Sequence, residues 1–167
     1  MRRSLTLSVV LAAIAVLAVP ALAASPIDVP REYRSKLAHV KNVSGIPVLL
    51  PSSLRAGIKP SRVFGTVEGL KRGRYELGLG VGRDCHGANA CFVAAFFGER
   101  GAGLSFKRRV ALAHGIVGRY HPISCGASCA PALVQWREGG VAYEIQFKGR
   151  KRQLVALANQ AIRAGAR

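Results

Sequence analysis

The chain has 167 residues, of which 50% are hydrophobic and 20% are charged, with 19 glycines and 8 prolines. This length fits one domain with a single core and excludes a multidomain enzyme, and the composition excludes wholesale disorder. Charge is the unusual feature, because 25 Lys and Arg against 8 Asp and Glu leave a net charge of +17. So few carboxylates leave little material for acid–base catalysis, and we expect a protein without enzymatic activity.

Residues 1–23 have the pattern of a secretory signal peptide. Arg2 and Arg3 precede an uncharged apolar run from Leu5 to Val19, and Ala21-Leu22-Ala23 forms a small-x-small cleavage site. The apolar run is shorter than the roughly 20 residues that span a bilayer, so we expect cleavage after Ala23 and no membrane span in the mature chain. The Arg pair also permits twin-arginine export.

Export would leave the basic character in place, since cleavage removes two cations and lowers the net charge only from +17 to +15. The mature protein would then work in the periplasm or outside the cell. Its expected partners there are anionic envelope polymers, lipid head groups and acidic proteins rather than nucleic acid. An Arg-rich surface that merely faces water is the alternative explanation of the charge.

Four cysteines, Cys85, Cys91, Cys125 and Cys129, follow the predicted cleavage point. An even number in an oxidising compartment predicts two disulfides, and the short Gly-containing segments favour the local pairs Cys85–Cys91 and Cys125–Cys129 over the other connectivities. A metal site with His86 or His121 is the alternative, but five residues between the first two cysteines exceed the usual zinc spacing. We therefore expect neither a metal nor a cofactor.

The first part of the mature chain predicts an extended lead-in and a helix, which open a domain over residues 32–167. Residues 24–31 contain two prolines and predict the lead-in. Apolar residues at helical spacing predict a helix over 32–43, which Gly45 ends. Residues 46–51, Ile-Pro-Val-Leu-Leu-Pro, predict a short extended segment whose prolines suit a sheet edge.

The middle of the chain predicts antiparallel strands. Residues 74–81 alternate apolar and polar side chains, and they form a hairpin with residues 63–68 around a turn at 69–73. The apolar run 91–97 predicts a central strand that is covered on both faces. Two further strands, 110–112 and 116–120, flank a tight turn at His114-Gly115.

The C-terminal third predicts a hairpin followed by a helix. Two alternating strands meet at the turn Gly139-Gly140, and the register predicts three facing pairs, Trp136 with Tyr143, Val134 with Ile145 and Ala132 with Phe147. Apolar residues at helical spacing predict an amphipathic helix over 150–164 that packs on this aromatic face. The expected fold class is α+β: a mainly antiparallel β-sheet with an amphipathic C-terminal helix packed on one face and an N-terminal helix.

Two stretches carry a resemblance to known proteins. The motif from Gly118 through Tyr120 and Pro122 to the Cys-Gly-Ala-Ser-Cys-Ala-Pro segment at 125–131, together with the pattern that follows it to Ala164, resembles a group of small secreted bacterial proteins of unknown function, which share the Ile46–Pro51 segment. The pattern that ends the chain is similar to extracytoplasmic sensor-like domains found beside anti-sigma factors; it consists of Trp136, Gly140, Tyr143 and the Leu- and Ala-rich helix Leu154–Ala164. Neither resemblance implies catalytic residues.

Cations gather in three clusters, which are Lys71-Arg72-Gly73-Arg74, Lys107-Arg108-Arg109 and the group Lys148, Arg150, Lys151 and Arg152. The last group stands at the start of the predicted C-terminal helix, where cations oppose the helix dipole. An anion held by these side chains and the free helix N–H groups would explain the placement, and the alternative is that the cations precede the helix and face water.

These observations together predict a secreted, non-catalytic binding or accessory protein of the bacterial envelope that binds anionic polymers or lipids through its basic clusters. Two alternatives remain open at this point. One is an envelope sensor domain that acts through protein contacts, and the other is an enzyme that uses the loop histidines His86 and His121.

Overall fold

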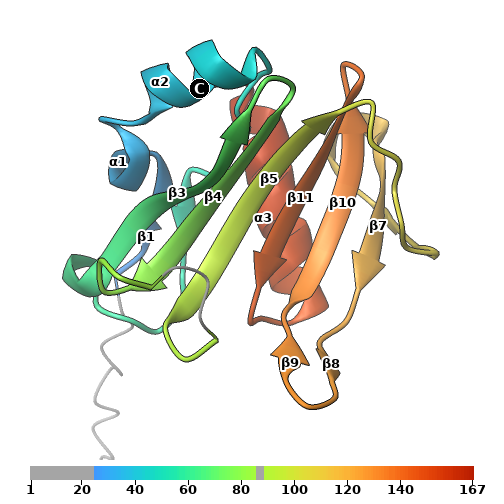
Figure 1. The fold of residues 1–167 in the computed structure, drawn as a ribbon. Helices are drawn as coiled ribbons and strands as arrows, with labels where there is room; N and C mark the ends of the chain where they lie inside the picture. Colours follow the sequence, from blue (N-terminus) through green and yellow to red (C-terminus); the bar gives the residue numbers. More distant parts are fainter. Residues whose placement is uncertain (1–24, 86–88) are drawn as a thin grey trace, which may run out of the picture.

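The computed structural model describes residues 25–85 and 89–167, so the predicted signal peptide and His86 lie outside the described residues. The fold is α+β, as predicted, with a seven-stranded antiparallel sheet and helices on one of its faces (Figure 1).

The sheet brings together strands from the whole described chain. Its spatial order is β3 (Val63–Lys71), β4 (Arg74–Val81), β5 (Phe92–Arg100), β11 (Val141–Phe147), β10 (Ala132–Glu138), β7 (Val117–His121) and β6 (Arg108–Ala111). Two short ladders complete the structure, one between β1 (Ile27–Asp28) and β2 (Ser53–Leu54) and one between β8 (Ser124–Cys125) and β9 (Cys129–Ala130). Short 3-10 turns lie at Pro60–Arg62 and Ala113–Gly115.

The β10–β11 hairpin has the predicted register. Trp136 faces Tyr143, and the other two predicted pairs along the strands are also confirmed. The turn between the strands is Gly139-Gly140, whose φ angles are +56° and +77°. A two-residue type I′ turn requires positive φ at both positions, and glycine adopts such angles without strain.

The C-terminal helix α3 (Lys151–Ala164) packs on β10 and β11. It buries the apolar positions that the sequence pattern predicted, which are Leu154, Leu157, Ala158, Ala161 and Ile162. Beneath it, Trp136 is 1% exposed and stacks on Tyr143, with 5.5 Å between the ring centroids. The aromatic pair and α3 therefore form the core on this side of the sheet.

The predicted N-terminal helix is divided into α1 (Val29–Tyr33) and α2 (Leu37–Ser44). Helix α1 begins before the predicted position because Asp28 accepts a hydrogen bond from the Arg31 N–H at 3.2 Å, which caps the first turn. Two short-range hydrogen bonds, from Arg34 N–H to Arg31 O and from Lys36 N–H to Tyr33 O, then tighten the chain and interrupt the helix.

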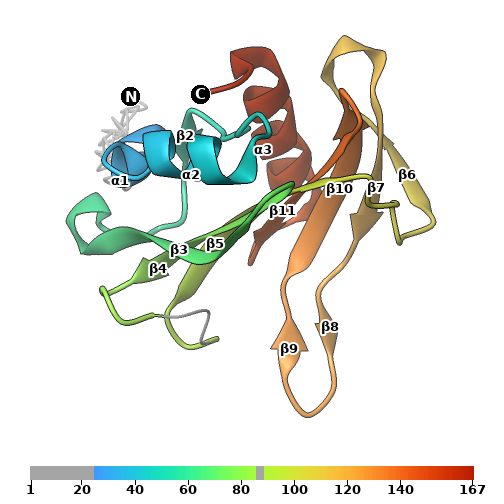
Figure 2. The same cartoon turned by 45° about the horizontal axis from the view of Figure 1, so that its top comes forward.

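Three further expectations need correction. Strand β3 continues to Lys71, so the β3–β4 turn is shorter than predicted. Residues 46–51 do not form a strand at the sheet edge, and they pair with Ala166 through a single bridge at Leu49. The helices cover only one face of β5 (Figure 2), and Phe97 is half-buried on the opposite face, which we call the open face.

Candidate anion-binding site

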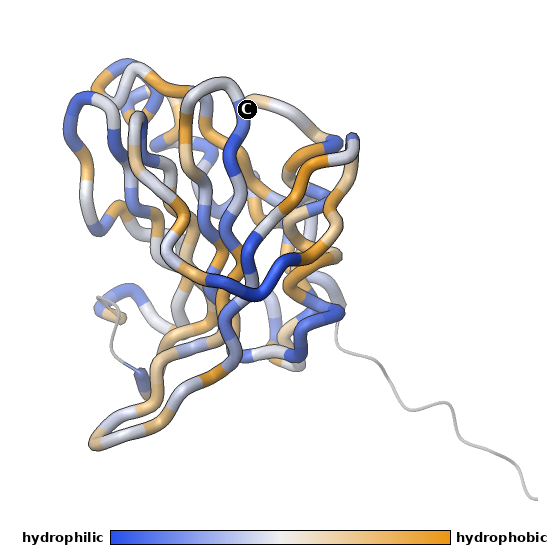
Figure 3. The backbone as a smooth tube through the Cα atoms, turned by 90° about the vertical axis from the view of Figure 1, so that its right-hand side faces the viewer, coloured by the Kyte–Doolittle hydropathy of each residue, from blue (hydrophilic) through white to orange (hydrophobic). Residues whose placement is uncertain are grey.

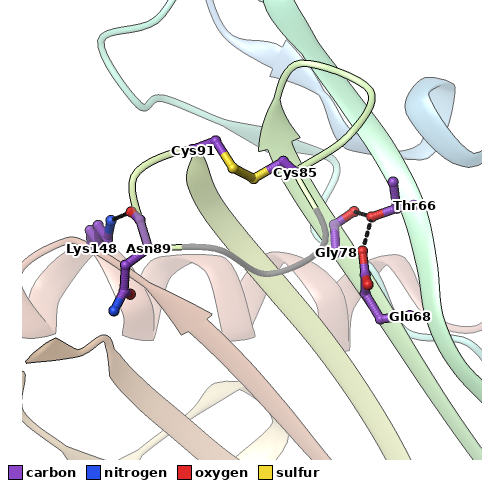
Figure 4. The surroundings of a disulfide bond; sticks show 7 residues. All are labelled: Thr66, Glu68, Gly78, Cys85, Asn89, Cys91 and Lys148. Carbon is purple, nitrogen blue, oxygen red and sulfur yellow. Dashed lines mark hydrogen bonds between the residues drawn. A yellow bond between two sulfur atoms is a disulfide. The ribbon is translucent and has the colours of Figure 1, made fainter. Parts of the chain in front are cut away.

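Two disulfides close loops at one end of the sheet, and they have the connectivity that the sequence favoured. The Cys85–Cys91 bond joins the end of β4 to the start of β5 (Figure 4). The Cys125–Cys129 bond closes the β8–β9 hairpin, where both cysteines are exposed. Disulfides are typical of proteins in an oxidising compartment.

Lys148 contacts the Cys85–Cys91 loop. Its Nζ donates a hydrogen bond to the carbonyl oxygen of Asn89 (Figure 4) and lies 5.7 Å from the centroid of the Phe92 ring. The structure therefore separates Lys148 from the other three cations of the predicted cluster.

The start of α3 holds the other three cations of that cluster, all of them exposed. Arg150 is the N-cap residue, and Lys151 and Arg152 begin the first turn, which contains no acidic residue. The side-chain oxygen of Gln153 accepts the Arg150 N–H at 2.8 Å. The N–H groups of Lys151 and Arg152 have no partner within the helix, as is general for a first turn. The predicted alternative, in which Arg150, Lys151 and Arg152 all precede the helix, thus holds for Arg150 but not for Lys151 and Arg152.

Tyr120 connects the start of α3 with the edge of the sheet. The Lys151 Nζ lies 5.7 Å from the centroid of the Tyr120 ring. Arg108 of β6 pairs directly with Tyr120 of β7, so the two side chains lie on the same face as neighbours. Arg108 and Lys151 therefore flank Tyr120 and bring two of the three predicted cation clusters together.

We call this region the basic end, and it consists of Arg108, Tyr120, Arg150, Lys151 and Arg152. None of its cations forms an ion pair with a carboxylate of the described residues. The third cation cluster lies at the β3–β4 turn, at the other end of the sheet (Figure 1). There Arg74 contacts Glu76 at 3.5 Å and Glu99 at 3.9 Å. The basic end therefore has no neutralising carboxylate among the described residues, and in the third cluster Arg74 is ion-paired whereas Lys71 and Arg72 are not.

The open face of the sheet has a different character. A hollow of about 130 Å³ beside the Cys85–Cys91 bond is lined by Glu68 and Glu76 as well as by Gly78 and Phe97. The Thr66 hydroxyl donates to Glu68 at 2.5 Å (Figure 4), which orients this carboxylate. Carboxylates repel anions, so this hollow does not compete with the basic end for an anionic ligand.

The alternative of an enzyme that uses His86 and His121 stays untested, because only His121 belongs to the described residues. His121 stacks on Phe106, with 4.4 Å between the ring centroids, and His86 lies outside the described residues. Among residues 25–85 and 89–167, no three His, Cys, Asp or Glu side chains are grouped as metal ligands. Within the same ranges, no helix has the length and apolar character needed to cross a membrane.

The chain matches no protein-family model, and it is not significantly similar to any curated protein or any solved structure. The function must therefore be argued from the geometry. The residue set that sequence reasoning missed is the group Arg108, Tyr120 and Lys151. Only the pairing of β6 with β7 and the position of α3 bring these residues together.

Proposed function

We propose that the protein is a secreted, non-catalytic binding protein of the bacterial envelope, and that its basic end binds an anionic polymer or an anionic surface. The leader pattern and the two disulfides support export. The observation that carries the proposal is that Arg108 and Lys151 both lie next to Tyr120, with Arg150 adjacent to Lys151 in the chain. No carboxylate of the described residues forms an ion pair with these cations.

The chemistry of these groups fits phosphate, sulfate or carboxylate groups. A guanidinium presents parallel N–H donors that match two oxygens of such an anion, and Arg108 and Arg150 supply two of these groups. The exposed first turn of α3 adds unpaired N–H groups and the positive end of the helix dipole. In the absence of a ligand the clustered cations repel one another, and a bound polyanion would relieve this repulsion.

The proposal is tested by two triple variants that remove the same net charge. The basic-end variant carries Arg108→Gln, Arg150→Gln and Lys151→Gln. The control carries Lys71→Gln, Arg72→Gln and Arg163→Gln, three exposed cations at the opposite end of the sheet and of α3. Binding of each protein to inorganic polyphosphate is measured by calorimetry at several NaCl concentrations.

We expect the logarithm of the wild-type binding constant to fall linearly with the logarithm of the salt concentration, because binding releases counterions. By analogy with phosphate contacts to nucleic acids, each lost contact reduces the slope by about 0.7 to 0.9, so the loss of three contacts should reduce the slope of the basic-end variant by about 2 to 3. The control variant should keep the wild-type slope. Equal losses of slope in the two variants would show that the protein attracts polyanions only through its overall positive charge, without a defined site, and would refute the proposal.

A further inference from the structure

We infer that the anionic ligand of the basic end is the surface of a lipid bilayer, and that the disulfide-closed β8–β9 hairpin enters its headgroup layer. This inference rests on the function proposed above, and it names the ligand class of the same end of the molecule.

The hairpin is the one uncharged projection of this end of the described structure. Residues 122–131 contain no charged side chain in a protein with a net charge of +17, and every residue from 123 to 130 is exposed. Figures 1 and 2 show the hairpin projecting beyond the sheet, and Figure 3 shows it without the strongly hydrophilic colouring of the cationic segments. Ile123 is 47% exposed, the largest value among the large hydrophobic residues of the described chain.

The Cys125–Cys129 bond holds this projection in one shape. A two-stranded ribbon that packs on nothing is marginally stable in water, and β8 and β9 have only two residues each. The disulfide and a hydrogen bond from the Gly126 N–H to Ser128 O, at 2.9 Å, close the tip. A preformed tip loses little conformational entropy on binding. Its outer backbone groups still need water, which places it in the headgroup layer and not in the hydrocarbon.

The hairpin and the basic end are at the right separation to act on one surface. Ile123 lies three residues beyond Tyr120, which is at most about 10 Å along an extended chain. Amphipathic segments enter the boundary between headgroups and acyl chains by about 5–10 Å, and the screening length at physiological salt is about 8 Å. Arg108 and Lys151 would therefore lie within about one screening length of the lipid phosphates when the hairpin, including Ile123 at its base, lies along the headgroup layer.

Other occupants fit this surface less well. A soluble polyanion would make no use of the exposed Ile123 or of the uncharged hairpin that follows it. A second copy of the chain would bring another set of unneutralised cations to Arg108 and Lys151, and the resulting repulsion opposes association. An anionic bilayer is the ligand that combines negative charge at the surface with an apolar layer directly beneath it.

The test uses two matched single variants, each of which replaces an exposed β-branched residue with glutamate. Ile123→Glu changes the hairpin, and Val43→Glu changes a residue of α2 that is 39% exposed and lies near the β3–β4 turn. Both variants change the net charge equally. Binding is measured by co-sedimentation with vesicles of phosphatidylglycerol and phosphatidylcholine, and separately by calorimetry with inorganic polyphosphate.

We expect Ile123→Glu to bind the vesicles about tenfold or more weakly, since it loses apolar contact and adds a charge that the anionic lipids repel. Its affinity for polyphosphate should fall much less, because only the screened repulsion of the added carboxylate acts on that ligand. Val43→Glu should match the wild type with both ligands. If Ile123→Glu and Val43→Glu bind vesicles equally well, or if Ile123→Glu loses both ligands together, the hairpin inference is overturned.

The two proposals fail in different ways. If the basic-end triple variant and its charge-matched control bind vesicles and polyphosphate with equal affinity, the proposed function fails, and the hairpin inference fails with it. If the basic-end variant is the weaker binder but Ile123→Glu is unaffected, the proposed function stands and the bilayer inference alone is wrong.

Discussion

Truncation of Trp136 perturbs the core beneath α3 and leaves the basic end untouched. The side chain is 1% exposed and stacks on Tyr143 with 5.5 Å between ring centroids. Trp136→Ala removes the largest buried side chain and leaves a cavity that neighbouring strands cannot close, so the free energy of unfolding should fall by about 3–5 kcal/mol. Since typical domains have only about 5–15 kcal/mol of stability, much of the protein's stability would be lost.

Trp136→Phe separates the packing of the ring from the polar group that it carries. The indole Nε1 is buried without a hydrogen-bond partner in the described structure, and an unpaired buried donor costs about 1–3 kcal/mol. Phenylalanine removes that donor and keeps an aromatic ring against Tyr143, while the smaller ring leaves some space. These two effects offset each other, and we expect Trp136→Phe to remain within about 1.5 kcal/mol of the wild type.

Urea unfolding followed by far-ultraviolet circular dichroism measures both variants, because Trp136 is the only tryptophan and its fluorescence is lost on substitution. An unchanged midpoint for Trp136→Ala would show that the side chain is not a core residue. A phenylalanine variant as unstable as the alanine variant would show that a phenyl ring does not replace the packing of the indole against Tyr143. Either result would refute the reasoning.

Two further predictions concern the aromatic residues near β5. Gly98→Ala should lower the free energy of unfolding, measured in urea, by about 1–3 kcal/mol, because a Cβ there would lie 2.4 Å from Cε1 of Tyr75. Gly103→Ala is the control, because Gly103 has open space around it. Equal urea midpoints for the two variants would contradict the prediction. Burial raises the pKa of Tyr143 from 10.0 to about 12 and raises the pKa of Tyr75 further. Above about pH 10 the unfolded chain therefore loses tyrosine protons that the folded protein keeps. The free energy of unfolding should then fall by up to about 1.4 kcal/mol per pH unit for each of these tyrosines, and below that pH these groups should have no effect on it. Urea midpoints that stay constant as the pH rises from about 9 to 11 would contradict this account.

The sequence was most informative where structure depends on neighbours in the chain. The β10–β11 register follows from a period-two pattern on both sides of Gly139-Gly140, and α3 follows from an amphipathic pattern of period 3.6. The C-terminal hairpin and the helix that covers it could therefore be predicted almost residue by residue.

Features that depend on distant contacts could not be predicted. The pairing of β5 with β11 joins segments that are more than 40 residues apart. The helix break after Tyr33 accompanies a hydrogen bond from the Tyr33 hydroxyl to Gly78 O at 2.5 Å, a contact across the fold. The wholly apolar pattern of β5 predicted cover on both faces, but Phe97 lines a hollow on the open face.

The candidate site was predictable only in part for the same reason. Clusters of cations are visible in the sequence, but their positions in space are not. The structure moves Lys148 to the Cys85–Cys91 loop and brings Arg108 to the start of α3 through Tyr120. A site assembled across β6, β7 and α3 has no local sequence signal that identifies its members.

Backbone amide NMR shifts during a titration with inorganic polyphosphate would test the central claim most directly, because they locate the bound anion on the molecule. The account predicts that the largest shifts occur at Arg108, Tyr120 and Lys151, and that the β3–β4 turn at Arg72 and Gly73 remains unaffected. Shifts of equal size at the two ends of the sheet, or shifts centred on the β3–β4 turn, would contradict the claim that the basic end is the binding site.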